Sequence, residues 1–290
     1  MNRFIRNNFL AICITLSVIF AFAKKATIFQ QETPKLTQPI VLAVNQQTNA
    51  VFQKYWKMHG VEITKFFLKQ DSLLIGEATL SYRLKELDKD QPNGVIYSLS
   101  FNFTQKIIQG DYNYSENTTT ITPLNTPLYP HALSVVSSSQ SNDGTDFLSF
   151  QPQPKSYLFI GRNSVEPEKE IYKSTEKGNL EDEIWAKIRL NLDALPQGEI
   201  EMIPSLGYWN KIHKSPSAQE VKAELKDLES TKKLKIYSLN YPALKRKLDI
   251  VFEASFPFQI IEFRDMIDGK TIIGSRETSK EIPNYPIPYP

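Results

Sequence analysis

The sequence contains a single cysteine, Cys13, and only three histidines, His59, His131 and His213, among 290 residues. One cysteine excludes a disulfide framework, an iron–sulfur cluster and a cysteine-based zinc site. The histidines are far apart along the chain, and no H-E-x-x-H motif brings two of them onto one helix face. We therefore expect neither a metal site nor a cofactor.

Glycine is also scarce, with 11 residues against 18 prolines, which argues against a Gly-rich phosphate-binding fold. Gly269-Lys270-Thr271 matches the end of a phosphate-binding loop, but Arg264 occupies the position of the required first glycine. The G-x-S-x-G turn of many esterases is missing too. No catalytic residue is predicted from these motifs.

Hydrophobic residues make up 41% of the chain, charged residues 23% and aromatic residues 11%. This composition is that of a globular protein, and the abundant aromatics favour strands that pack against a core. The length fits two average domains or one large β-rich domain.

The first 23 residues have the pattern of a secretory signal peptide. Arg3 and Arg6 precede an apolar run of 15 residues, Phe9–Ala23, which ends in a small-x-small sequence. The alternative is an uncleaved membrane anchor, although a spanning helix needs about 20 apolar residues. Lipid attachment at Cys13 is not indicated, because Ile12 before it is not small. We expect cleavage after Ala23.

Cleavage leaves a neutral chain. The 34 Lys and Arg side chains, less the two arginines of the signal, equal the 32 Asp and Glu side chains. A neutral surface does not attract nucleic acid or anionic lipid, so membrane contact is expected only through export or the uncleaved segment. The protein should be exported, and periplasmic or envelope-associated. We expect a flexible lead over residues 24–49, one domain over residues 50–280 and an extended Pro-rich tail over residues 281–290.

Alternation of apolar and polar residues predicts antiparallel strands. It is clear over residues 74–85, 95–104 and 248–256, and it indicates one buried and one solvated face. Asp268-Gly269 is typical of a hairpin turn, and Pro92-Asn93-Gly94 of a turn between the first two of these runs. Further strands are expected at 61–68, 131–138, 157–160, 199–203, 234–241, 260–266 and 271–275.

Two helices are expected, near residues 180–190 and 216–230. Asn179 can cap the first, with acidic Glu181, Asp182 and Glu183 in its first turn. Ser217 and Glu220 fit a capping box for the second. We predict a mainly β (α+β) fold, with a single curved antiparallel sheet, a half-barrel or a sandwich. The polar, aromatic segment 110–130, with Tyr112 and Tyr114, should lie between strands.

An ordered set of short strings resembles an uncharacterised family of exported Gram-negative bacterial proteins, often labelled "septum formation inhibitor Maf". The chain lacks the S-x-S-P-R-R motif of the Maf nucleotide pyrophosphatases, so the resemblance implies export and a shared fold, with no catalytic residue to carry over. It spans about residues 52–265. The strings are 55–56, 60–64, 76–78, 110–115, 181–185, 188–189, 195–198, 203–205, His213, 241–242 and 256–257.

Arg189 is expected to pair with a buried carboxylate, either Glu62 or Glu77, while Trp185 should anchor the core. A ligand contact is the alternative for Arg189. The candidate binding or structural cluster comprises Glu62, Glu77, Tyr112, Tyr114, His131, Glu181, Trp185, Arg189 and His213.

The sequence is compatible with three functions. The first is non-catalytic binding of an envelope protein or an apolar small molecule in the curved sheet. The second is an exported hydrolase using Glu181, Asp182, His131 or His213. The third is a structural or assembly component of the envelope.

Overall fold

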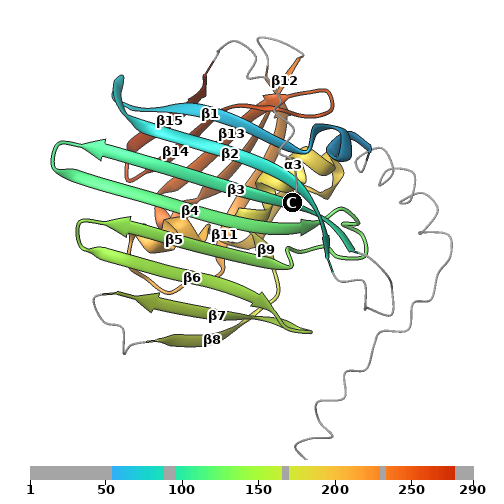
Figure 1. Ribbon diagram of the computed structural model, residues 1–290, viewed down its shortest axis with the longest axis horizontal. Coiled ribbons are helices and arrows are strands. Elements are labelled where there is room, and N and C mark those ends of the chain that lie inside the picture. The colour runs from blue at the N-terminus through green and yellow to red at the C-terminus, as the bar shows by residue number, and fades with distance from the viewer. Residues whose placement is uncertain (1–53, 88–95, 165–169, 229–232, 278–290) are drawn as a thin grey trace, which may run out of the picture. The chain divides into compact units, whose positions relative to one another are not determined.

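The computed structural model describes residues 54–87, 96–164, 170–228 and 233–277 (Figure 1). All of them belong to one compact unit, Asn45–Pro290. The signal segment, the lead, the Pro92–Gly94 turn and the Pro-rich tail lie outside the described residues. Predictions about them stay predictions.

The described residues are mostly strands. A short helical segment covers residues 54–59. The strands, in chain order, are β1 Val61–Gln70, β2 Leu73–Leu87, β3 Ile96–Gln109, β4 Tyr112–Pro123, β5 Ser134–Ser141, β6 Gly144–Pro152, β7 Ser156–Asn163, β8 Ile171–Glu176, β9 Asn179–Leu180, β10 Gly198–Ile203, β11 Gln219–Asp227, β12 Leu234–Tyr241, β13 Arg246–Glu253, β14 Ile260–Ile267 and β15 Lys270–Arg276. The helices are α3 Glu181–Leu190 and α4 Leu206–Lys211, with 3₁₀ turns η1 Leu192–Ala194 and η2 Pro242–Leu244.

These strands form one 15-stranded sheet in the order β8-β7-β6-β5-β4-β3-β2-β1-β15-β14-β13-β12-β11-β10-β9. Neighbouring strands are antiparallel, except for the short parallel pair β9 and β10. The sheet is not closed, since β8 and β9 lie at its two edges. The prediction of a mainly β, largely antiparallel sheet is confirmed.

The alternation read from the sequence accounts for this sheet. In β2, Ala78, Leu80 and Tyr82 are buried, and the residues between them are more exposed. The Asp268-Gly269 turn joins β14 to β15 with positive φ at both residues, 49° and 80°, as a tight hairpin requires.

The sheet curves around α3. Three strands separate Phe103 of β3 from Phe263 of β14 in the sheet, yet their ring centroids are 5.8 Å apart. Trp185 of α3 packs on both rings, at 5.7 and 5.6 Å. Figure 1 shows the strands from β12 to β15 behind β1–β3, with α3 next to them. The apolar faces of distant strands therefore share one core, which α3 fills.

The expected helix at 216–230 is wrong, because Gln219–Asp227 forms β11. Its buried side chains are Val221 and Ala223, two residues apart, with exposed Glu220 and Lys222 around them on the other face. The sequence also permits an apolar stripe at helical spacing, but pairing with β10 and β12 satisfies the backbone of this segment. Tertiary pairing outweighs the local helical pattern.

The helix near 180–190 is confirmed as α3, although its cap differs. Leu180, not Asn179, is the N-cap, and its backbone N–H donates to the Glu183 carboxylate at 3.4 Å. The second helix is α4, which Ser205 caps through a 3.1 Å hydrogen bond from the Tyr208 N–H. No helix in the described ranges is long and apolar enough to cross a membrane.

The segment expected to lie between strands contains β4. Its threonines are β-branched, and Thr118, Thr120 and Thr122 alternate inward and are buried. The expected strand at 131–138 begins only at Ser134, and β6 and β8 were not predicted. The inner face of β4 carries polar side chains, so its sequence lacks the apolar–polar alternation by which the other strands were predicted.

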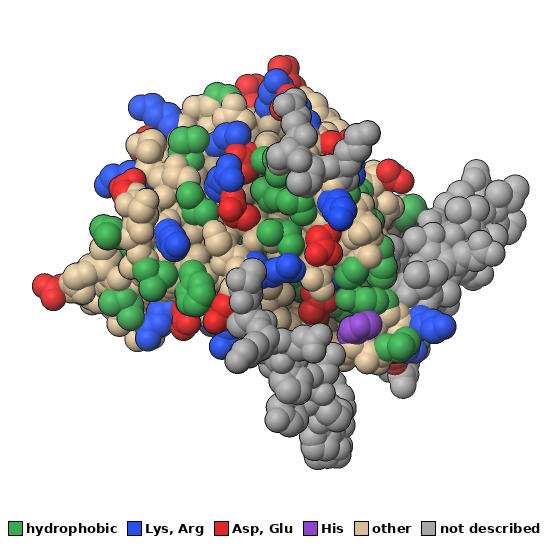
Figure 2. All heavy atoms as spheres, turned by 90° about the horizontal axis from the view of Figure 1, so that it is seen from above, with side chains coloured by type: hydrophobic (Ala, Val, Ile, Leu, Met, Phe, Trp, Pro, Cys, Tyr) green, Lys and Arg blue, Asp and Glu red, His purple; other side chains and the backbone are tan. Residues whose placement is uncertain are grey.

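The visible surface mixes both signs of charge. Figure 2 shows Lys and Arg side chains interspersed with Asp and Glu, with hydrophobic side chains scattered among them. The face in that view does not present a large field of one sign.

Candidate functional site

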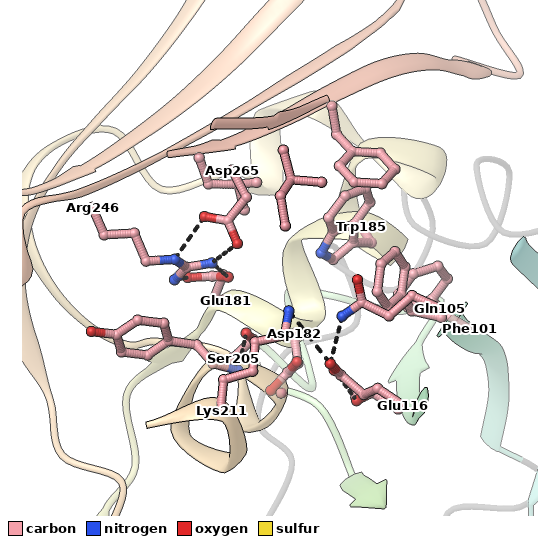
Figure 3. A pocket seen from close by; sticks show the side chains of 17 residues that line it. Phe101, Gln105, Glu116, Glu181, Asp182, Trp185, Ser205, Lys211, Arg246 and Asp265 are labelled. Atoms are coloured by element: carbon pink, nitrogen blue, oxygen red, sulfur yellow. Dashed lines mark hydrogen bonds and ion pairs between the residues drawn. The ribbon is translucent and has the colours of Figure 1, made fainter. Parts of the chain in front are cut away.

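A cavity of about 50 Å³ lies inside the curved sheet, beside α3 and α4 (Figure 3). Aromatic side chains of β3, β14 and α3 line one part of it. The rest is lined by ionisable groups, namely Glu116, Glu181, Asp182, Lys211, Arg246 and Asp265. Its volume suits water and not a larger molecule.

Arg246 of β13 holds two carboxylates at this cavity. Its Nη1 and Nη2 donate to the two oxygens of Glu181 at 2.6 and 2.8 Å, and its Nε donates to Asp265 at 2.9 Å. Burial alone would lower the pKa of Arg246, but Asp265 and Glu181 hold it well above its ordinary value. The guanidinium also lies over the Tyr208 ring, 4.7 Å from its centroid.

Glu116 of β4 is a second buried carboxylate with several donors. It accepts from Gln105 Nε2 at 2.6 Å, from the Tyr114 hydroxyl at 2.9 Å and from Thr118 Oγ1 at 3.2 Å. Lys211 Nζ lies 3.7 Å away. A Cβ on Gly207 would lie 1.7 Å from Glu116 Oε1, so only glycine lets α4 approach this carboxylate.

Asp182, in the first turn of α3, has a buried carboxyl that accepts a hydrogen bond from the Leu206 N–H at 3.0 Å, through Oδ2. Burial raises its pKa well above the ordinary value, and neighbouring Glu181 and Glu116 add to the rise, while the Leu206 hydrogen bond and Arg246 oppose it. The environment of Asp182 therefore favours its neutral form.

The raised pKa of Asp182 predicts how the stability of the fold depends on pH. A carboxyl whose folded-state pKa exceeds its unfolded-state value stabilises the fold at low pH, and this contribution is lost as pH rises towards the folded-state pKa. Asp182→Asn keeps an acceptor for Leu206 and does not ionise. Above pH 4, the stability of the variant relative to wild type should rise by up to about 1.4 kcal/mol per pH unit. Urea denaturation from pH 4 to 8 measures this, and parallel curves would contradict it.

Arg189 joins three segments of the fold. Its Nη1 and Nη2 donate to the two oxygens of Glu62 on β1, both at 2.8 Å, and its Nε donates to the Pro257 carbonyl at 2.6 Å. The guanidinium lies over the rings of Trp56 and Tyr82, 5.2 and 4.5 Å from their centroids. Of the two expected partners, the structure brings Glu62 to Arg189. Glu77 is exposed on β2.

Glu183 forms a third buried centre. It accepts from Lys187 Nζ at 2.7 Å and from the Ala132 N–H at 2.7 Å, and His131 Nδ1 lies 3.4 Å away. Burial would raise the pKa of Glu183, but Lys187 and His131 outweigh that effect and lower it. This cluster ties α3 to the segment before β5.

A groove of about 280 Å³ lies outside these clusters, between the inner face of β6–β8 and the end of α4. Leu148, Phe159, Ile171 and Trp209 supply its apolar wall. Gly161 lies opposite both Leu148 and Ile171 across the strands. A Cβ there would meet Phe159 and Leu148 at 3.1 and 3.3 Å, so these two side chains pack closely against the Gly161 backbone.

The other end of the groove is polar. Asp146, Asn210, His213 and Lys214 line it, and His213 Nδ1 lies 3.7 Å from Asp146 Oδ2. The indole N–H of Trp209 and the side-chain oxygen of Asn210 are buried without a hydrogen-bond partner. His213 itself has a positive φ of 52°, which is uncommon for a residue other than glycine.

The nine predicted candidates do not form one site. Glu62 and Arg189 bind each other, Glu181 and Trp185 line the small cavity, and Tyr114 reaches Glu116 beside it. His131 contacts Glu183, and His213 lies at the groove. Glu77 and Tyr112 are exposed, and the Tyr112 ring stacks on that of Tyr114 with the centroids 6.3 Å apart. Of the residues named for a hydrolase, Glu181 and Asp182 share the small cavity, whereas His131 and His213 lie at two other places.

Sequence reasoning missed several of the residues that the geometry emphasises, which are Glu116, Lys211, Arg246, Asp265, Trp209 and Asn210. Arg246 and Glu116 occupy inward positions of alternating strands, and that position was the available signal. Within the described ranges, no group of three His, Cys, Asp or Glu side chains is arranged to hold a metal ion.

No family model matches the sequence, and no curated protein matches it. A solved structure that resembles the chain is a β-barrel-like protein of a domain of unknown function, DUF1849, from Brucella abortus. The two share 10% sequence identity, and the match covers 74% of this chain and 94% of that one, with a TM-score of 0.43.

Proposed function

We propose that the protein is a non-catalytic binding protein of the cell envelope, and that its ligand site is the groove between α4 and β6–β8. The amino-terminal signal pattern supports export. So does the resemblance of the ordered strings to the exported family labelled septum formation inhibitor Maf. The groove supports binding, because it combines an apolar wall with polar groups at one end.

The observation that carries this proposal is the lining of the groove, which joins an apolar wall to a polar end. Sites for small molecules are mostly apolar, with a few polar groups that fix the orientation of the ligand. A ligand with an apolar body and one polar group suits this lining.

The groove suits a ligand better than the interior of the sheet. The interior cavity is about 50 Å³ and is surrounded by paired charges, whereas the groove is about 280 Å³. Pockets for small molecules are commonly about 300–1,000 Å³. We therefore place the apolar ligand, or the apolar anchor of a partner, at the groove and not in the concave core.

The test uses N-phenyl-1-naphthylamine, an apolar fluorescent amine, as the probe. The dye should brighten on titration with the purified protein, and Gly161→Ala should weaken its binding about tenfold. The added methyl group would push Phe159 and Leu148, and both of these side chains line the groove.

Gly178→Ala is the matched control, because a Cβ at that position meets nothing within 4 Å. It should bind the dye as wild type does. Equal binding by wild type and Gly161→Ala, with both variants folded by circular dichroism, would place the dye elsewhere and refute the groove site.

A further inference from the structure

Strand β8 ends the sheet on the side of the groove. Among the described residues, it pairs with β7 and with no strand beyond it. All but one of its side chains are exposed, including the large apolar Ile171 and Tyr172. An edge of this kind presents unpaired backbone groups to an incoming chain.

The register identifies which backbone groups are unpaired. Ser156 lies opposite Glu176, and one step further the Lys177 N–H donates to the Lys155 carbonyl at 3.4 Å. Hydrogen-bonded and non-hydrogen-bonded pairs alternate in an antiparallel ladder. Ile171, Lys173 and Thr175 therefore bond to β7. The N–H and C=O groups of Tyr172, Ser174 and Glu176 point outwards, away from β7.

The open edge and the groove are continuous. Ile171 belongs to β8 and also lines the groove, opposite Gly161. Side chains two residues apart lie on the same face of a strand. Lys173 is thus on the groove side of the sheet with Ile171. A strand added to β8 would place alternate side chains beside the groove.

A second copy of this chain is a poor occupant of that edge. Outward-pointing residues must pair with outward-pointing residues, which restricts the possible registers. An antiparallel register centred on Lys173 sets the two lysines against each other and Glu170 against Glu176. The register centred on Ser174 forms no pair of opposite charges. Like charges directly opposite each other are destabilising.

The charges instead suit an acidic partner. Lys173 is exposed on the groove face of β8, and Lys214 lines the groove from the other side. We propose that β8 accepts an extended acidic segment of another polypeptide as an added strand. One apolar side chain of that segment enters the groove near Ile171, and an acidic side chain two residues away lies beside Lys173. This inference rests on the proposed use of the groove for binding.

The probe is a labelled peptide, Thr-Leu-Thr-Glu-Thr-Val-Thr, which presents Leu, Glu and Val on one face when extended. Fluorescence anisotropy should show saturable binding, and replacing its Glu by Lys should weaken binding at least fivefold. Lys173→Glu in the protein should reverse this preference.

Ser174→Pro tests the edge itself. It removes an outward-pointing N–H without removing a bond to β7, so β8 should stay in the sheet while peptide binding weakens at least tenfold. Ser174→Ala keeps the N–H and should bind within twofold of wild type.

The outcomes separate this inference from the proposed function. The inference is overturned if the peptide does not bind, or binds Ser174→Pro as it binds wild type. If N-phenyl-1-naphthylamine still binds in a manner sensitive to Gly161→Ala, the groove site survives that result. Peptide binding that is sensitive to Ser174→Pro but unchanged in Gly161→Ala would overturn insertion of a side chain into the groove.

Discussion

Replacing Arg246 by methionine should lower the free energy of unfolding by about 3–5 kcal/mol. The variant would leave the buried Glu181 carboxyl group with neither of the two hydrogen bonds that Arg246 now donates to it. Asp265 would lose the same partner. The Glu181 and Arg246 side chains are each only 2% exposed, so they are shielded from bulk solvent. Urea denaturation at pH 7 measures the loss.

A double variant distinguishes the lost pairing from lost packing. Arg246→Met combined with Glu181→Leu removes both buried charges and should recover more than half of the lost stability. Arg264→Met is the control, because Arg264 pairs with Glu262 on the solvent side, where an ion pair contributes about 0–1 kcal/mol. If Arg246→Met costs no more than Arg264→Met, the buried network does not stabilise the fold as described.

Period-two alternation made the central strands predictable, because one face of this sheet is buried and the other is wet. The same reasoning failed for Gln219–Asp227, whose Val221 and Leu225 also fit a helical stripe. Only pairing with β10 and β12 decides between the two structures, and a local pattern does not contain that information. It also failed for β4, where buried threonines replace the expected aliphatic residues.

The candidate site was harder to predict than the strands. The sequence analysis expected Arg189 to pair with either Glu62 or Glu77, because an arginine next to the apolar Ile188 on a helix needs a carboxylate partner when it is buried. The structure shows the pair with Glu62. Arg246 and Glu116 could have been noticed as charges at inward strand positions. Their partners could not, because Glu181 and Arg246 are 65 residues apart and meet only when the sheet curls. The groove likewise depends on α4, a helix that the sequence did not indicate.

Arg189→Met should also destabilise the protein strongly, by about 3 kcal/mol or more. The Arg189 side chain is only 1% exposed and forms a bidentate ion pair with Glu62. It also stacks on Trp56 and Tyr82, which methionine would replace only in part. Loss of the arginine would detach the helical segment 54–59 and β1 from α3. Proteolysis near residues 54–62 should therefore accelerate, together with a lower urea midpoint.

Arg189→Lys refines this expectation. A lysine keeps the positive charge but presents no planar fork for the two Glu62 oxygens, so it should recover less than half of the lost stability. Lys235→Met is the control, because Lys235 pairs with the exposed Asp227 and should contribute under about 1 kcal/mol. If Arg189→Met leaves the urea midpoint unchanged, the ion pair of Arg189 does not stabilise the fold. That result would favour the alternative, in which Arg189 contacts a ligand.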